Sequence, residues 1–123
     1  MTDLNTVRRI ASSLPEVEVR SNETAVNFYV RGKQFAWTYL ERVARRHREP
    51  RPDVLAIRCA AEEKQSLLES APEKFFTTDH YKGFPAVLVR LGAVDERELR
   101  GLLTAAWRCQ APRTLAKQLL KEG

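Results

Sequence analysis

The chain begins with two different spacings of its hydrophobic residues. Leu4, Val7, Ala11 and Leu14 recur three or four positions apart, which predicts an amphipathic helix over residues 3–13. Thr2 or Asp3 can cap its start, and Pro15 follows its end. From residue 17 onward the spacing changes to strict alternation, which is typical of half-buried strands.

Three alternating runs follow one another, and the last two are separated by Gly32 and Lys33. Each run places its apolar residues at every second position: Val17 and Val19; Val26, Phe28 and Val30; Phe35, Trp37 and Tyr39. Gly32-Lys33 suits a tight turn, so the second and third runs predict a β-hairpin. On this pattern all three aromatic residues of the third run share one face, directed toward the core.

The segment 41–53 breaks the alternation with a run of charges and two prolines, which predicts a loop with one helical turn at its start. Five arginines against two glutamates make residues 41–52 the densest positive segment of the chain. Beyond it, apolar spacing predicts a strand over 54–60 and a helix over 61–71 that ends before Pro72.

The C-terminal half predicts two more strands and two more helices. KFFTT is a short strand, and a second strand covers about 85–91. Asp95 can cap the following helix while Glu98 reaches back, a variant of the capping box. That helix ends at Ala111-Pro112, and a last helix covers about 112–121.

This order of elements predicts the fold class. Helix, three strands, a further strand, helix, two strands and two helices make an α+β domain. The alternating, hairpin-linked strands favour an antiparallel sheet covered by helices, in two layers. A length of 123 residues fits a single domain over 1–123.

Composition limits the classes of function. The net charge of +5 favours anionic partners such as nucleic acid. No long apolar run suggests a membrane span or a secretory signal, so we expect a cytoplasmic protein without a membrane partner. Cys59 and Cys109 lie in apolar patterns and are expected as buried, reduced thiols. With only two histidines and no ligand spacing, we expect no metal and no cofactor.

Positively charged turns are the first candidate binding residues. Arg31 and Lys33 flank one hairpin turn, and Lys82 projects from the turn Tyr81-Lys82-Gly83 between the last two strands. Such tips can contact backbone phosphates, and an aromatic ring beside them can stack on a base. Turn tips are also charged simply because they are solvated, so both interpretations stay open.

Two other features complete the candidate set. The 41–52 segment contributes Arg45, Arg46 and Arg48. In the last helix Arg113, Lys117 and Lys121 stand four residues apart and form one basic stripe. The stripe is either a solvated face or a phosphate-binding face.

Asp79 and His80 are the residues with most potential for catalysis. His80 could act as a general base oriented by Asp79, with Tyr81 beside it. Neighbouring residues in an extended chain point to opposite sides, however, and no nucleophile has a recognisable surrounding motif. We therefore expect no enzyme; the alternatives for His80 are a binding role or a hydrogen bond to a backbone carbonyl, with Asp79 organising the turn.

The order of these motifs resembles the MmcQ/YjbR family of small bacterial proteins. The resemblance runs from about residue 4 to residue 120 and is carried by LPEV, by VNFYVRGKQFAW and by FFTTDHYKGFPAVLVRLGAVDERELRGLLTAAWRCQAP. It implies a compact α+β fold of double-wing type with a DNA-binding role and no catalytic residues. The wings would fall near Gly32-Lys33 and Tyr81-Lys82-Gly83.

Two hypotheses of function follow. In the first, the protein binds DNA with little sequence preference, through backbone contacts made by Arg31, Lys33, Arg45, Arg46, Arg48, His80, Tyr81, Lys82, Arg113 and Lys117. In the second, it is a protein-interaction or regulatory adaptor, for which Tyr29 and Tyr39 are candidate surface residues. An exposed apolar patch would favour the second.

Overall fold

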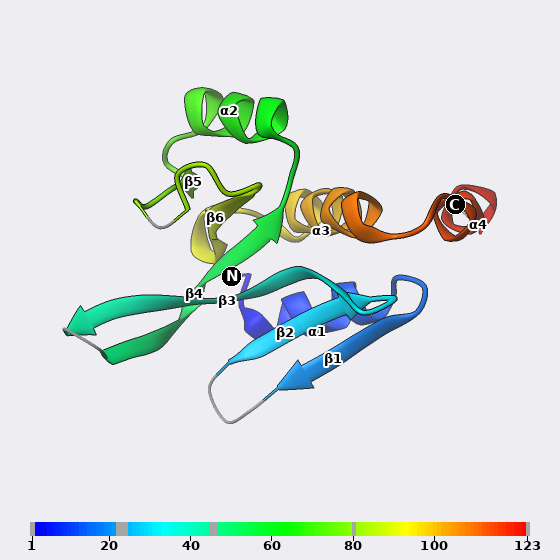
Figure 1. Cartoon of the computed structure of the whole chain (residues 1–123), viewed down its shortest axis with the longest axis horizontal. Coiled ribbons are helices and arrows are strands. Elements are labelled where there is room, and N and C mark those ends of the chain that lie inside the picture. The colour runs from blue at the N-terminus through cyan, green and yellow to red at the C-terminus, as the bar shows by residue number, and fades with distance from the viewer. Residues whose placement is uncertain (1, 22–24, 45–46, 80, 123) are drawn as a thin grey trace.

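A six-stranded antiparallel sheet with helices against it forms the protein, as predicted from the sequence (Figure 1). The computed structural model describes residues 2–21, 25–44, 47–79 and 81–122, with side chains except at 42–48 and 118–122. The helices are α1 (Leu4–Ser12), α2 (Ala61–Ser70), α3 (Glu96–Gln110) and α4 (Arg113–Glu122), with a 3-10 turn η1 (Leu91–Ala93). The strands are β1 (Val17–Ser21), β2 (Val26–Val30), β3 (Lys33–Ala44), β4 (His47–Arg58), β5 (Phe75–Phe76) and β6 (Ala86–Arg90).

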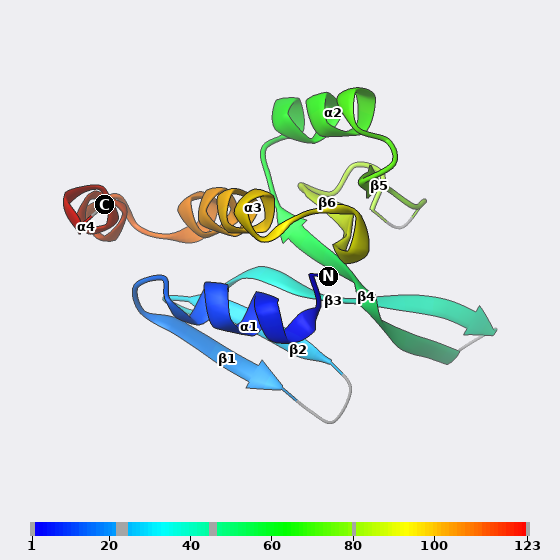
Figure 2. The same ribbon diagram turned by 180° about the vertical axis from the view of Figure 1, so that it is seen from behind.

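The strand order is β1-β2-β3-β4-β6-β5, and every neighbouring pair is antiparallel. Helices α1 and α3 lie against one face, which Figure 2 shows from the α1 side. Apolar side chains from these helices and from the strands fill the space between the layers, including Val7, Ile10, Phe28, Leu103 and Trp107. Burying this contiguous apolar surface is the main source of stability.

Helix α3 starts where the sequence predicted. The Asp95 carboxylate accepts a hydrogen bond from the Glu98 backbone N–H at 2.7 Å, and the Glu98 side chain accepts from the Asp95 N–H at 3.3 Å. This reciprocal capping box is confirmed. It fixes the helix that carries Trp107, whose side chain is completely buried.

The turn between β2 and β3 is a two-residue hairpin turn. Val30 pairs with Lys33, so Arg31 and Gly32 are its central residues, with φ angles of 51° and 81°. Positive φ at both positions is the signature of a type I′ turn, whose twist matches the flanking strands. Lys33 is therefore the first residue of β3 rather than part of the turn itself.

A β-bulge in β3 overturns the prediction that Phe35, Trp37 and Tyr39 share a face. Phe28 pairs with Ala36 and Tyr29 with Gln34, so Phe35 is the extra residue between two paired positions. The extra residue shifts the alternation by one. Phe35 therefore packs in the helix-covered core, whereas Trp37 and Tyr39 project from the opposite face. We call that opposite face the aromatic face.

The prediction of a loop over 41–53 was also wrong. Strands β3 and β4 continue through this segment as a long hairpin, in which Tyr39 pairs with Arg51 and Glu41 with Glu49. Strand β6 pairs with β4 only from Val54 to Arg58. The outer part of β4 therefore has no second neighbour, and both charges and prolines are tolerated there.

Candidate nucleic-acid interface

The segment between β5 and β6, which is described at residues 77–79 and 81–85 and which we call the 77–85 segment, folds back against the aromatic face instead of projecting from it. Tyr81 is only 8% exposed, and its hydroxyl accepts a hydrogen bond from Trp37 Nε1 at 3.0 Å. Its ring centroid lies 6.5 Å from that of Trp37 and 6.0 Å from that of Tyr39. Tyr81 thus holds the segment in place, and its ring is not available to stack on a base.

Lys64 of α2 fastens the same segment from outside the sheet. Its Nζ donates to the backbone carbonyl of Tyr81 at 2.5 Å and to that of Phe84 at 2.8 Å. Burial lowers the pKa of Lys64, because the ammonium is partly removed from water. The turn at 81–84 is therefore fixed from two sides, which sets the position of Phe84.

Phe84 is an exposed aromatic residue at the edge of this segment. Its side chain is 42% exposed, and its ring meets Trp37 edge-on with centroids 6.2 Å apart. The guanidinium carbon of Arg58 lies 5.2 Å from the same ring centroid. A cation at this distance is attracted to the face of the ring. Arg58 and Phe84 therefore form a pair of a cation and an accessible aromatic surface.

These residues line a cavity of about 380 Å³, which we call the basic groove. Its lining residues are Lys33, Gln34, Trp37, Arg58, Phe84 and Gln110. The Gln110 side chain closes one wall by donating to the Gln34 carbonyl at 2.9 Å. The groove thus joins the start of β3, the end of β4, the 77–85 segment and the end of α3.

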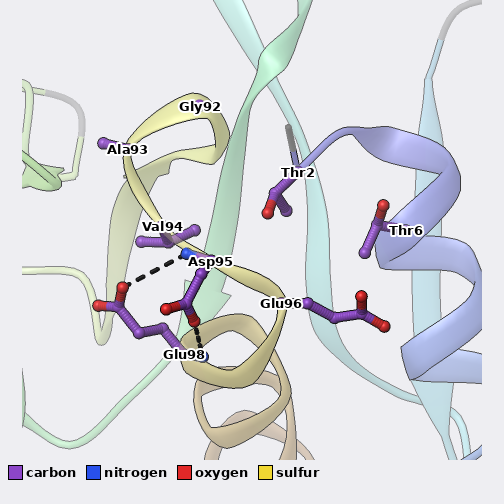
Figure 3. A pocket seen from close by; sticks show the side chains of 8 residues that line it. All are labelled: Thr2, Thr6, Gly92, Ala93, Val94, Asp95, Glu96 and Glu98. Atoms are coloured by element: carbon purple, nitrogen blue, oxygen red, sulfur yellow. Dashed lines mark hydrogen bonds between the residues drawn. The ribbon is translucent and has the colours of Figure 1, made fainter.

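The charge of the basic groove distinguishes it from three other cavities on the described surface. A cavity of about 520 Å³ beside α1 is lined by Asp95, Glu96 and Glu98 (Figure 3). Two further cavities each mix cations with carboxylates. The basic groove is lined by two cations and, among the described residues, by no carboxylate. It is the cavity of these four that suits an anion.

Several other cations are neutralised by neighbouring carboxylates. Arg31 donates from Nε and Nη2 to the two oxygens of Glu16 at 2.7 and 2.8 Å. This hydrogen bonding raises the pKa of Arg31 and lowers that of Glu16. Arg51 is held in the same way by Asp53 and Glu41. The tip residue Arg31, predicted as a phosphate contact, is therefore engaged within the protein.

Lys33 and Arg58 have a different environment. In the described part of the chain, neither side chain makes an ion pair with a carboxylate. Lys82 is exposed two residues from Phe84, and α4 begins three residues after Gln110 with the exposed Arg113 and Lys117. Of the binding residues predicted from the sequence, Lys33 therefore lies in the basic groove. Lys82, Arg113 and Lys117 lie on chain segments that continue from residues of the groove.

The described strands of the arginine-rich segment lead away from the groove. Strand β3 has Lys33 at one end and the hairpin tip at the other, and twelve residues of strand span roughly 35–40 Å. Figure 1 shows the far ends of β3 and β4 on the side of the molecule opposite to the β2–β3 turn. Arg48 belongs to β4, but its side chain is outside the description, as are Arg45, Arg46 and His80 altogether. These four predictions are thus not placed relative to the groove.

Of the six lining residues only Lys33 was predicted from the sequence; Arg58 and Phe84, which supply the second cation and the exposed ring, were not. Phe84 directly precedes a predicted strand and Arg58 lies within another, over 54–60, and pattern alone does not tell a core residue from a surface one there. The only sign of their role was an arginine within an otherwise apolar strand and an aromatic residue directly after a turn glycine.

Among the residues that the structure describes, the remaining chemistry-bearing side chains form no second site. Within the described ranges, no group of three histidine, cysteine or acidic residues is placed to hold a metal ion, and none of the helices there has the length and apolar character to cross a membrane. Asp79 is exposed, two positions before the buried Tyr81 in the sequence. Both cysteines are free; Cys59 is buried as predicted, but Cys109 is exposed. Burial raises the pKa of Cys59 to about 11.

Comparison with known proteins gives one family. The model of the YjbR family matches residues 12–109. Uncharacterised proteins of Mycobacterium bovis and Mycobacterium tuberculosis are each 33% identical over 128 residues, covering 98% of this chain and 97% of the relative. A crystal structure of a Deinococcus radiodurans protein with the domain DUF419 superposes with a TM-score of 0.66 at 19% identity, over 87% of this chain and 77% of that one. The latter likeness supports the fold alone.

Proposed function

The chain belongs to the YjbR family, and from this premise and the basic groove we propose that it binds DNA through backbone phosphates and performs no chemistry of its own. The observation that carries the proposal is the pair Lys33 and Arg58, two cations without carboxylate partners in one groove of the described surface. In this proposal the β2–β3 hairpin and the 77–85 segment are the two wings, and the protein acts in the cytoplasm.

The charges support phosphate binding by a physical argument. A cation that is already paired gains little from a phosphate, because it must first give up its own carboxylate. Lys33 and Arg58 pay no such cost, and an arginine fork suits phosphate geometry. Lys82, Arg113 and Lys117 are exposed on adjoining segments, where they can contact further phosphates along a strand.

The proposal predicts strong salt dependence. Each phosphate neutralised on duplex DNA contributes about 0.9 to the slope of log K against log salt concentration. We expect fluorescence anisotropy with a labelled duplex of mixed sequence to show binding at 50 mM salt that weakens steeply by 200 mM. The double variant Lys33→Glu/Arg58→Glu should bind more weakly and with a slope shallower by about 2.

Arg97→Glu/Arg100→Glu is the matched control, since it reverses two exposed positive charges, as the double variant does. Arg97 lies in the first turn of α3, and Gln110 at the other end is about 20 Å away along the helix axis. The affinity of this control variant for the duplex should stay close to that of the wild type. Absence of duplex binding at 50 mM salt, or equal losses in all variants, would overturn the proposal.

A protein-interaction role is a second candidate, favoured by strand β1. This strand is at the edge of the sheet, exposed along most of its length, with Val19 36% exposed. An open edge can add a strand from a partner protein. The large exposed apolar residues Val19, Leu40 and Phe84 nevertheless come from three separate elements. A stoichiometric, nuclease-resistant complex that Val19→Lys abolishes would favour this role over DNA binding.

A further inference from the structure

We propose that the basic groove holds an unpaired base of a DNA strand, which makes single-stranded DNA, or duplex with unpaired nucleotides, the preferred ligand. The base would stack on the ring of Phe84, beside the indole of Trp37, while its flanking phosphates meet Lys33 and Arg58. This inference rests on the proposed function and adds to it the state of the DNA that is recognised.

The first argument is the exposure of Phe84. A phenylalanine that is 42% exposed leaves apolar surface in water, although Trp37, Tyr81 and Arg58 already contact its ring. The surrounding contacts hold the ring rather than cover it. A flat base that covered the free part would remove this surface from water, and stacking on aromatic rings is a common mode of binding single strands.

The second argument is the combination of residues in one cavity. Phosphate binding alone needs only cations, but the basic groove also contains an indole and a phenyl ring beside Lys33 and Arg58. Gln34 and Gln110 add amide groups that can bond to base edges. The volume of about 380 Å³ lies within the range of ligand-binding pockets. Charge and aromatic surface together fit a nucleotide better than an isolated phosphate.

The third argument concerns access. A base inside a duplex has both of its faces covered by its neighbours, so only an unpaired base can present a face to a protein ring. The basic groove opens beside the aromatic face, over which Figure 1 shows β1–β3 with no helix of the described chain in front. A flexible single strand can follow this surface more readily than a stiff duplex.

Aromatic and positively charged side chains also lie on the aromatic face of the sheet outside the basic groove. Asn27 pairs with Trp37 across β2 and β3, and Tyr29 pairs with Gln34, so these side chains share the aromatic face. The guanidinium carbon of Arg20 lies 4.3 Å from the ring centroid of Tyr29. Tyr29 and Arg20 thus repeat the pairing of Phe84 and Arg58, and they give the adjacent nucleotides a second aromatic surface with a cation.

The test compares a labelled oligothymidine of about 15 nucleotides with a duplex of the same length at one salt concentration. We expect the single strand to bind more tightly. Phe84→Leu keeps an apolar side chain without the aromatic face, and it should weaken single-strand binding about 5-fold or more, as loss of one stacked base does. Binding of the duplex should change by less than about 2-fold, because phosphate contacts carry it.

Two variants make the test specific. Phe84→Tyr keeps the ring and should retain single-strand affinity. Leu40→Ala removes an apolar side chain of the same 42% exposure that lies farther along β3 and outside the groove, so it should have no effect. Thermal unfolding of each variant confirms that it is folded.

The possible failures are distinguishable. Duplex binding that depends on Lys33 and Arg58, with no preference for the single strand and no effect of Phe84→Leu, would overturn this inference and leave the proposed function standing. Absence of binding to both DNAs would overturn both. Tighter binding of oligouridine than of oligothymidine would overturn DNA as the ligand, since the same groove would then serve RNA.

Discussion

The two tryptophans of the chain occupy opposite faces of the sheet, and their surroundings differ. Trp107 is completely buried between the sheet and the helices, and its Nε1 donates to the Pro15 carbonyl at 3.0 Å. Trp37 is partly exposed on the aromatic face, where its Nε1 donates to the Tyr81 hydroxyl at the same distance. Both indoles have a hydrogen-bond partner, but only one lies beside open surface.

This difference indicates a division of roles. The helix-covered face consists of apolar side chains at near-complete burial, and its contribution is to stability. The aromatic face uses rings with polar groups, and part of their surface stays accessible. Substitutions on the first face should therefore change the free energy of unfolding, while substitutions at the open part of the second should change binding.

The largest expected effect is on the helix-covered face. Trp107→Ala removes a completely buried indole and leaves the Pro15 carbonyl without its donor. We expect a loss of about 3–5 kcal/mol in the free energy of unfolding. Urea denaturation followed by circular dichroism measures it. A loss below about 1 kcal/mol would contradict the placement of Trp107 in a closely packed core.

A smaller change in the free energy of unfolding is expected at Tyr81, whose buried ring lies beside Trp37 of the basic groove. Tyr81→Phe keeps the buried ring but removes the hydroxyl that accepts from Trp37, at a cost of about 1 kcal/mol. It should also shift the indole N–H resonance of Trp37 while that of Trp107 stays in place. Denaturation and a ¹H–¹⁵N spectrum of the same sample test both statements, and an unmoved Trp37 resonance would contradict the hydrogen bond.

The smallest expected effect on stability comes from the exposed ion pair of Glu16 and Arg31, and it depends on pH. Hydrogen bonding from Arg31 lowers the pKa of Glu16 below its ordinary value of 4.5. A carboxyl group whose pKa is lowered on folding stabilises the protein at pH values above its pKa in the unfolded chain. This stabilisation is lost as the pH falls through the pKa of the folded state. In wild type the free energy of unfolding, measured by urea denaturation, should fall between pH 7 and pH 3. In Glu16→Gln and in Arg31→Gln this fall should be smaller. An unchanged pH dependence in both variants would show that the pair contributes nothing in solution, as is common for exposed ion pairs.

The sequence predicted the features that depend on local chemistry. Asp95 and Glu98 cap α3 because their spacing alone determines that contact, and Gly32 supplies a positive φ that the tight turn requires. The antiparallel α+β fold followed from alternation and element order. Lys33 was found because a cation next to a turn glycine is visible in the sequence.

The sequence could not show what depends on tertiary pairing. The bulge at Phe35 arises from the register between β2 and β3, and it sends Trp37 and Tyr39 to the face opposite the helices. The length of the β3–β4 hairpin arises from pairing across a charged segment that resembles a loop. The neutralisation of Arg31 by Glu16 joins residues fifteen positions apart.

The most direct test of the account is a titration of ¹⁵N-labelled protein with oligothymidine, followed at the two indole N–H resonances, which Trp37→Phe assigns. We predict that the Trp37 resonance shifts progressively to saturation while the Trp107 resonance stays fixed, and that Lys33→Glu/Arg58→Glu suppresses the shift at the same DNA concentration. A saturable shift of other resonances with Trp37 unmoved would place the DNA away from the basic groove and contradict the account.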